Sequence, residues 1–214
     1  MSRLIDAGLE QLSRLIFKMG DLAEKTVLLS LDCYMKGVDV HEKVRVLSET
    51  LVSLSEEAED KAVELIARYQ PVASDLRTIK SYMKIAYDLS RYGRYAWDIT
   101  HIHKRLDIKL DECRFPWMPL EEISGKVLRM VHTSIEAIKK HDVALAKTLN
   151  AMEREVDEIY YRCLDKLVER SPPLIGCVVS TLLFIRHLER IADHAAYIGE
   201  SVIYIVTGER VSLR

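Results

Sequence analysis

The segment HLERIADHAAYIGE (residues 187–200) places acidic side chains where the surrounding pattern has apolar ones. On an α-helix, Glu189, Asp193 and Glu200 fall within about 40° of one direction, which is that of the apolar stripe. A carboxylate that is buried, ionised and unpaired costs several kcal/mol of stability. These acids must therefore be protonated, paired with cations or bound to a metal ion.

A second acidic pair precedes the first along the chain. Glu153 and Asp157 are four residues apart, as are Glu189 and Asp193, and this spacing makes the members of each pair neighbours on the surface of a helix. If the two helices pack side by side, four carboxylates come together. Carboxylate oxygens are hard ligands that suit iron, manganese, magnesium or calcium. The sequence therefore predicts a metal site.

Other interpretations of these acids stay open. Arg186 and Arg190 stand close enough in the sequence to neutralise the cluster, and Glu-x-x-x-Asp is common on any solvated helix. The chain would then be a structural helical bundle without metal. A metal-dependent enzyme, such as a phosphatase or an oxidase, could also use carboxylates alone. However, the sequence has no pair of Glu-x-x-His motifs, no phosphate-binding loop and no hydrolase motif, which favours a protein without catalytic activity.

The elements that carry these acids are predicted to be helices. Apolar residues recur at steps of three and four almost throughout, and strand patterns are absent. Turn residues divide the chain into six segments, so the fold class is all-α. The predicted helices span residues 4–36, 40–69, 72–107, 120–140, 143–170 and 174–206.

The two halves of the chain resemble one another. DLSRYGRYAWDI (88–99) aligns with HLERIADHAAYI (187–198), which indicates an internal duplication. Helices joined by short turns pack antiparallel, so each half is predicted to form a three-helix bundle. We place these tandem bundles at residues 1–108 and 118–214.

The duplication predicts a second, incomplete acidic site. Glu56 and Asp60 match the acidic pair on the second helix of the other half, and we count them as candidate metal ligands. On the third helix, however, Ser90 and Arg94 stand where the other half has its second acidic pair. We therefore expect little metal binding in the first half, with Arg94 forming a salt bridge to Glu56 or Asp60 instead.

The composition narrows the classes of partner and compartment. The chain has 214 residues with 31 basic and 33 acidic side chains, so no basic excess points to nucleic acid. No uncharged stretch is long enough to span a membrane. The N-terminal segment carries Asp6 and Glu10 where a signal peptide would be apolar, and we therefore expect a cytoplasmic protein without membrane insertion.

The cysteines are expected to be reduced. They are widely spaced and form no Cys-x-x-Cys pair, so no second soft ligand is in place for zinc. A cytoplasmic bundle of this size needs no disulfide for stability. We therefore predict four free thiols, at Cys33, Cys113, Cys163 and Cys177.

Two long strings carry a family resemblance. FIRHLERIADHAAYIGESVIYIVTGERV (184–211) and QPVASDLRTIKSYMKIAYDL (70–89) resemble the signature segments of the PhoU family of phosphate-uptake regulators. The resemblance implies two similar three-helix bundles whose acidic motifs bind metal ions, in some members as multinuclear iron clusters. It thus makes iron the first candidate at Glu153, Asp157, Glu189 and Asp193, with manganese, magnesium and calcium as alternatives.

The resemblance also implies a function and partners. Members of the PhoU family are cytoplasmic negative regulators of phosphate acquisition, so this chain would be an adaptor that acts on the high-affinity phosphate ABC transporter and its signalling. The implied partners are subunits of that transporter and, in bacteria, a sensor histidine kinase. Independently, the long amphipathic helix predicted at 4–36 has apolar residues on more than one face, so we expect a homo-oligomer.

Overall fold

The part of the chain that the structure describes is a bundle of six long helices. The computed structural model describes residues 4–106, 115, 117–170 and 175–213, and these ranges contain no strand. The predicted all-α fold is thus confirmed, and every helix end lies within two residues of its predicted position. The helices are α1 (Asp6–Lys36), α2 (His41–Tyr69), α3 (Ala73–Leu106), α4 (Leu120–Lys140), α5 (Val143–Arg170) and α6 (Ile175–Thr207).

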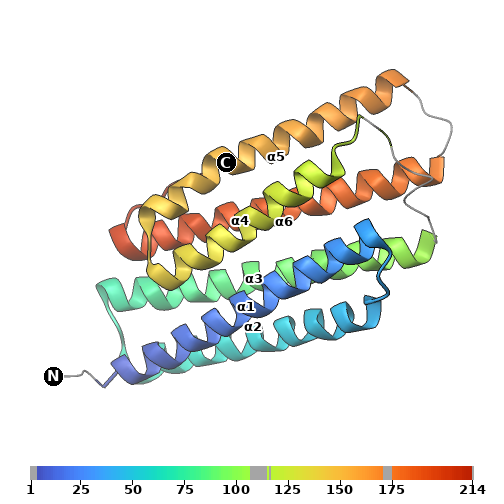
Figure 1. Cartoon of the computed structure of the whole chain (residues 1–214). Helices are drawn as coiled ribbons and strands as arrows, with labels where there is room; N and C mark the ends of the chain where they lie inside the picture. Colours follow the sequence, from blue (N-terminus) through green and yellow to red (C-terminus); the bar gives the residue numbers. More distant parts are fainter. Residues whose placement is uncertain (1–3, 107–114, 116, 171–174, 214) are drawn as a thin grey trace.

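The helices form two groups of three that lie side by side along one long axis (Figure 1). α1, α2 and α3 pack together, as do α4, α5 and α6, and α3 packs against α6 where the groups meet. Each predicted half therefore contains one three-helix group. The boundaries 1–108 and 118–214 stay a prediction, because residues 107–114 and 116 lie outside the described part of the chain. Residues 171–174, between α5 and α6, also lie outside it.

Short turns with defined backbone geometry make the helices antiparallel. Gly37 ends α1 in the left-handed region, with φ 68°, and donates its N–H to the carbonyl oxygen of Cys33 at 3.0 Å. At the start of α5, the Asp142 Oδ1 accepts the backbone N–H of Leu145 at 2.9 Å and caps the helix. Both turns therefore fix the direction of the helix that follows.

Buried polar and aromatic contacts join the two halves. The Tyr34 ring of α1 stacks on Phe184 of α6 with ring centroids 3.9 Å apart. The Tyr92 hydroxyl of α3 lies 3.0 Å from the Ser134 Oγ of α4. Because a buried hydroxyl left without a partner is costly, these contacts favour one register of the halves over others.

The cysteines correct one sequence prediction. Cys33 and Cys163 are free and buried, as expected. Cys177, near the start of α6, is disulfide-bonded, so the prediction of four free thiols is wrong. Cys113 lies outside the described residues. The prediction rested on the expected compartment and on the size of the bundle, and neither of these limits how close two sulfur atoms lie in a helical bundle.

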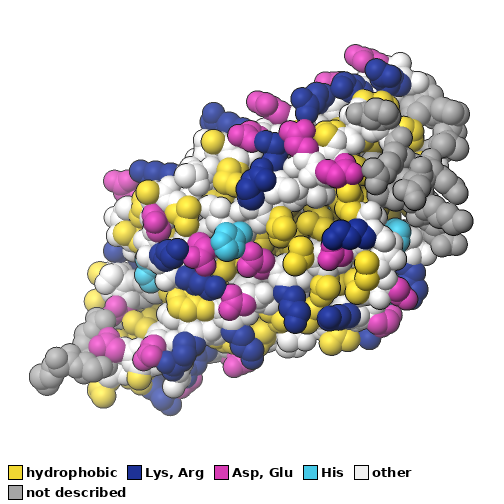
Figure 2. Space-filling model, viewed as in Figure 1, with side chains coloured by type: hydrophobic (Ala, Val, Ile, Leu, Met, Phe, Trp, Pro, Cys, Tyr) yellow, Lys and Arg dark blue, Asp and Glu magenta, His cyan; other side chains and the backbone are white. Residues whose placement is uncertain are grey.

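The surface mixes charges of both signs. Figure 2 shows Lys and Arg side chains interspersed with Asp and Glu over one face, with hydrophobic side chains between them. This mixture agrees with the near balance of 31 basic and 33 acidic residues. In the part of the chain that the structure describes, no helix has the length and apolar character needed to cross a membrane.

Close packing between α2 and α3 generates a stability prediction. A Cβ added at Gly93 would lie 2.6 Å from the Leu51 Cδ1 and 3.3 Å from the Ser48 Cα. Gly93→Ala should therefore lower the free energy of unfolding by about 1–3 kcal/mol, despite the better helix propensity of alanine. Urea denaturation followed by circular dichroism measures this change.

The control is the same substitution at an uncrowded helical glycine. A Cβ at Gly125 would meet only the Arg129 Nη1, at 3.6 Å. Gly125→Ala should therefore raise the free energy of unfolding by about 0.5–1 kcal/mol. Equal stabilisation by both substitutions would contradict the close approach of α2 to α3.

Candidate metal centre

Three acidic side chains meet between α5 and α6. Glu153 and Asp157 come from α5 and Asp193 from α6, and one carboxylate oxygen of each lies within 4.8 Å of the others. Glu153 is 3% exposed and Asp193 is 0% exposed, whereas Asp157 is half-buried at the open side of the group. The structure therefore brings together three of the four second-half residues in an arrangement that can hold a cation.

Glu189 lies one helical turn before Asp193 and is only 4% exposed. Burial disfavours its charged form, and the negative charge of Asp193 adds to this effect. Together they raise the pKa of Glu189 from an ordinary value near 4.5 to about 7, even though Arg186 and Arg190 act in the opposite direction. The fourth predicted ligand is thus electrostatically coupled to the group, and one positive charge there would favour its ionisation.

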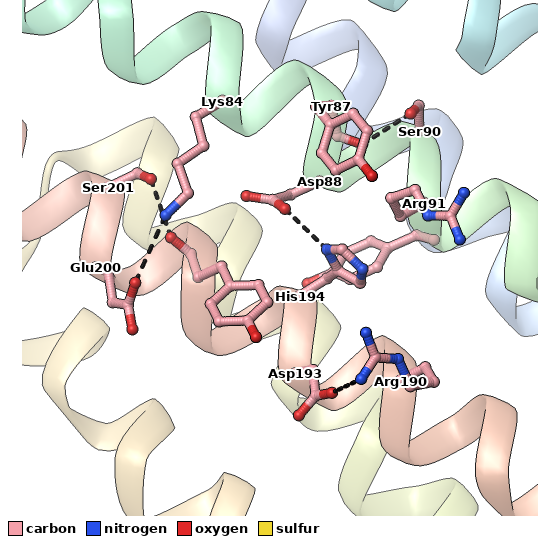
Figure 3. A network of polar contacts seen from close by, with 12 residues as sticks. Lys84, Tyr87, Asp88, Ser90, Arg91, Arg190, Asp193, His194, Glu200 and Ser201 are labelled. Carbon is pink, nitrogen blue, oxygen red and sulfur yellow. Dashed lines mark hydrogen bonds and ion pairs between the residues drawn. The ribbon is translucent and has the colours of Figure 1, made fainter. Parts of the chain in front are cut away.

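Two arginines of α6 neutralise these acids in the structure. The Arg186 Nη1 donates to the Glu189 Oε2 at 2.7 Å, and the Arg190 Nη1 donates to the Asp193 Oδ2 at 2.7 Å. The second of these ion pairs is visible in Figure 3. The arginine pairing that the sequence left open is therefore present. The same carboxylates are hard oxygen donors, so the residues fit a metal ion that replaces arginine as the source of positive charge.

The candidate acids of the first half do not join a comparable group. Glu56 and Asp60 are exposed on α2. Successive buried residues of α5 are three or four positions apart, and the same intervals recur in the same order in α2 between His41 and Ala58. When these two series of buried residues are aligned, Ser48 of α2 corresponds to Glu153 of α5.

The position of Arg94 agrees with that register. A small cavity of about 120 Å³ is lined by Arg94 together with Ser48 and Val52 of α2. The predicted salt bridge from Arg94 to Glu56 or Asp60 is not formed. Arg94 instead pairs with Asp98, one turn further along α3, at 3.5 Å, because an acid four residues away on the same helix is within easy reach.

Glu200 is turned away from the acidic group. Its Oε2 lies 3.5 Å from the Lys84 Nζ, and its Oε1 accepts the backbone N–H of Leu213 at 3.1 Å. Figure 3 shows Glu200 directed toward Lys84, at a distance from Asp193. The position of Glu200 on the apolar stripe therefore predicted that its side chain is partly buried, but it did not predict that Lys84 is its partner.

A buried hydrogen bond across the halves was not predicted from the sequence. The His194 Nδ1 of α6 lies 2.8 Å from the Asp88 Oδ1 of α3, and both side chains are buried (Figure 3). Burial raises the pKa of Asp88, although His194 opposes this rise. In the repeat alignment Asp88 corresponds to His187, which lies on the opposite side of the helix from the stripe of Glu189 and Asp193, so the stripe gave no signal for this contact. His194 is thus engaged by Asp88 and not by the acidic group.

Comparison with known proteins agrees with this architecture. The family model described as the PhoU domain matches the chain twice, over residues 16–102 and 120–202. The chain belongs to the PhoU family. A phosphate-specific transport system accessory protein, a PhoU homologue from Pseudomonas putida, is 32% identical over 99% of this chain and 84% of its own length. A homologue of the same description from Clostridium acetobutylicum is 29% identical over 99% of this chain and 98% of its own length.

Solved PhoU structures share the fold. The crystal structure of PhoU from Pseudomonas aeruginosa has a TM-score of 0.86 at 29% identity, and the match covers 96% of this chain and 100% of that one. The phosphate transport system regulatory protein PhoU from Streptococcus pneumoniae, at 24% identity and a TM-score of 0.85, has the same fold. The two PhoU repeats extend through both three-helix groups.

The raised pKa of Glu189 predicts how the stability of this PhoU-family chain without bound metal depends on pH. The folded state binds a proton at about pH 7 and the unfolded state near 4.5, so the free energy of unfolding should fall as pH rises between these values. The loss attributable to Glu189 is at most about 3 kcal/mol. Urea denaturation in the presence of a chelator, from pH 4.5 to 8, measures it.

Glu189→Gln is the matched variant, because it keeps the shape of the side chain and cannot ionise. Its free energy of unfolding should fall less between pH 4.5 and 7 than that of the wild type. Two parallel pH profiles would show that the pKa of Glu189 is not raised.

Proposed function

We propose that this PhoU-family chain is a cytoplasmic accessory regulator of a phosphate-specific transport system. The observation that supports this role is similarity over 99% of the chain to proteins described as phosphate-specific transport system accessory proteins. In this role the chain is an adaptor that restrains the high-affinity phosphate ABC transporter, and it catalyses no reaction itself. Its partners are subunits of that transporter and, where one exists, the sensor histidine kinase that controls phosphate-response genes.

The adaptor carries a metal ion in its second half. The ligands are Glu153, Asp157 and Asp193, with Glu189 completing the set, and iron is the first candidate ahead of manganese, magnesium and calcium. Support comes from the mutual approach of three carboxylates within 4.8 Å at a helix interface. The ion supplies the positive charge that lets buried carboxylates stay ionised, and it thereby stabilises the packing of α5 on α6.

The acidic group predicts how substitutions change metal content. Asp193→Asn and Glu189→Gln should each abolish binding of iron or manganese, because each removes a charged ligand. Elemental analysis of the purified protein, and titration of the chelator-treated protein with Mn²⁺, measure this loss. Chelation should also lower the thermal midpoint of the wild type.

Asp60→Asn is the control, because Asp60 is an exposed acid at the other candidate position. It should leave the metal content unchanged. Equal metal loss from Asp60→Asn and Asp193→Asn would contradict a site confined to the second half. If Asp193→Asn retains metal, or if the wild type binds none, the metal centre is excluded.

The adaptor role predicts a physical partner. An affinity-tagged chain, expressed with the phosphate ABC transporter of the same cell, should co-purify transporter subunits that are identified by mass spectrometry. Deletion of the gene should raise phosphate uptake and the expression of phosphate-response genes under phosphate-replete conditions. Unchanged uptake and no recovered transporter subunit would contradict the proposal.

The enzyme alternative is tested on the same preparation. An adaptor loaded with Mn²⁺ or Fe²⁺ should show no phosphatase turnover with a generic phosphomonoester. Turnover that disappears in Asp193→Asn would establish the acidic group as a catalytic site and overturn the adaptor assignment.

A further inference from the structure

A cavity of about 260 Å³ lies between α3, α6 and the segment that follows α6. Its wall includes Lys80 and Lys84 from α3, Glu200 from α6, and Arg210 from the C-terminal segment. Figure 3 shows Lys84 reaching toward Glu200 beside Ser201. Because Glu200 follows Asp193 by two helical turns, this cavity is separate from the acidic group.

The cavity has more positive than negative charge. Its single carboxylate, Glu200, lies 3.5 Å from the Lys84 Nζ. Arg210 packs over the Tyr204 ring at 5.6 Å, and neither Arg210 nor Lys80 forms an ion pair with any described residue. Three cations therefore surround one acid that is already engaged. This arrangement leaves a positive potential in a partly enclosed space, where charge interactions are stronger than in bulk water.

A fourth cation lies beside the cavity. The Arg77 guanidinium packs against Gly208, two residues before Arg210, with its Cζ 3.5 Å from where a Cβ of that glycine would lie. The Arg77 Nε is shielded from solvent and has no hydrogen-bond acceptor among the described residues. A buried donor of this kind usually has an acceptor, and the oxygen atoms of a ligand bound nearby would supply one.

We propose that this cavity binds a small, multiply charged oxyanion of the phosphate class. Lys and Arg side chains and hydroxyl groups are the usual partners of phosphate oxygens, and Ser81 and Ser201 supply hydroxyls on the wall. A volume of about 260 Å³ lies below the range typical of drug-sized ligands, so the space fits a small ion better than a nucleotide. Glu200 limits the affinity, because it brings a like charge close to the anion.

Binding of inorganic phosphate to the chelator-treated full chain, measured by titration calorimetry at low ionic strength, tests this proposal. Chelation removes any metal ion through which the acidic group could bind phosphate. A lack of phosphate binding in this experiment therefore tests the cavity alone and leaves the proposed metal centre to its own test. The wild type should bind phosphate, and Lys80→Ala and Arg210→Ala should each weaken binding about tenfold. Lys80 and Arg210 are exposed, so both variants should keep the helical circular dichroism of the wild type.

Two further variants sharpen the test. Lys43→Ala removes an exposed lysine of α2 that lies outside the cavity, and it should leave phosphate affinity unchanged. Glu200→Gln keeps an acceptor for the backbone N–H of Leu213 and removes the negative charge, so it should tighten phosphate binding. A general effect of surface charge would make Lys43→Ala and Lys80→Ala equivalent.

Three results would overturn the proposal. The first is no phosphate binding by the wild type, in which case these cations serve only the C-terminal end of α6. The second is equal weakening by Lys43→Ala and Lys80→Ala. The third is binding to vesicles containing phosphatidic acid without binding to free phosphate, which would assign the cavity to a lipid headgroup.

Discussion

Glu153, Glu189 and Asp193 are buried between α5 and α6, where negative charge without compensation costs several kcal/mol of stability. The structure compensates with Arg186 and Arg190, and burial still raises the pKa of Glu189 to about 7. The packing of α5 on α6 therefore depends on a supply of positive charge at this point. A metal ion supplies that charge more compactly than two long side chains, which also lose conformational freedom when they are fixed in place.

Arg190 connects the acidic group to the other half of the molecule. Besides pairing with Asp193, Arg190 lies close enough to Tyr95 of α3 that Tyr95 raises the pKa of its guanidinium, and the Arg91 Nη2 donates to the Tyr95 hydroxyl at 2.9 Å. Although burial opposes them, these two arginines lower the pKa of Tyr95. A cation that took the place of Arg190 at Asp193 would change the contacts of α6 with α3. The acidic group is thus placed to influence how the two halves pack against each other.

The helices were predictable because the apolar steps of three and four and the turns at Gly37 and Asp142 act locally. The second-half acids were predictable because an acid on an apolar stripe requires compensation. The alignment of α2 with α5 was not predictable, because Glu-x-x-x-Asp recurs on any charged helix. Only the pattern of buried residues shows that Ser48, and not Glu56, corresponds to Glu153. Partners of long side chains, such as Asp98 for Arg94, and the disulfide of Cys177 depend on distances that spacing along the sequence does not give.

The most direct test of the central claim is anomalous diffraction from crystals of the iron-loaded protein at the iron absorption edge. The account predicts an anomalous peak between α5 and α6, within about 2.0–2.6 Å of carboxylate oxygens of Asp157 and Asp193, with Arg190 displaced from Asp193. No peak at this position, with Arg186 and Arg190 still paired as described, would show that arginine alone compensates the buried acids and would contradict the metal centre.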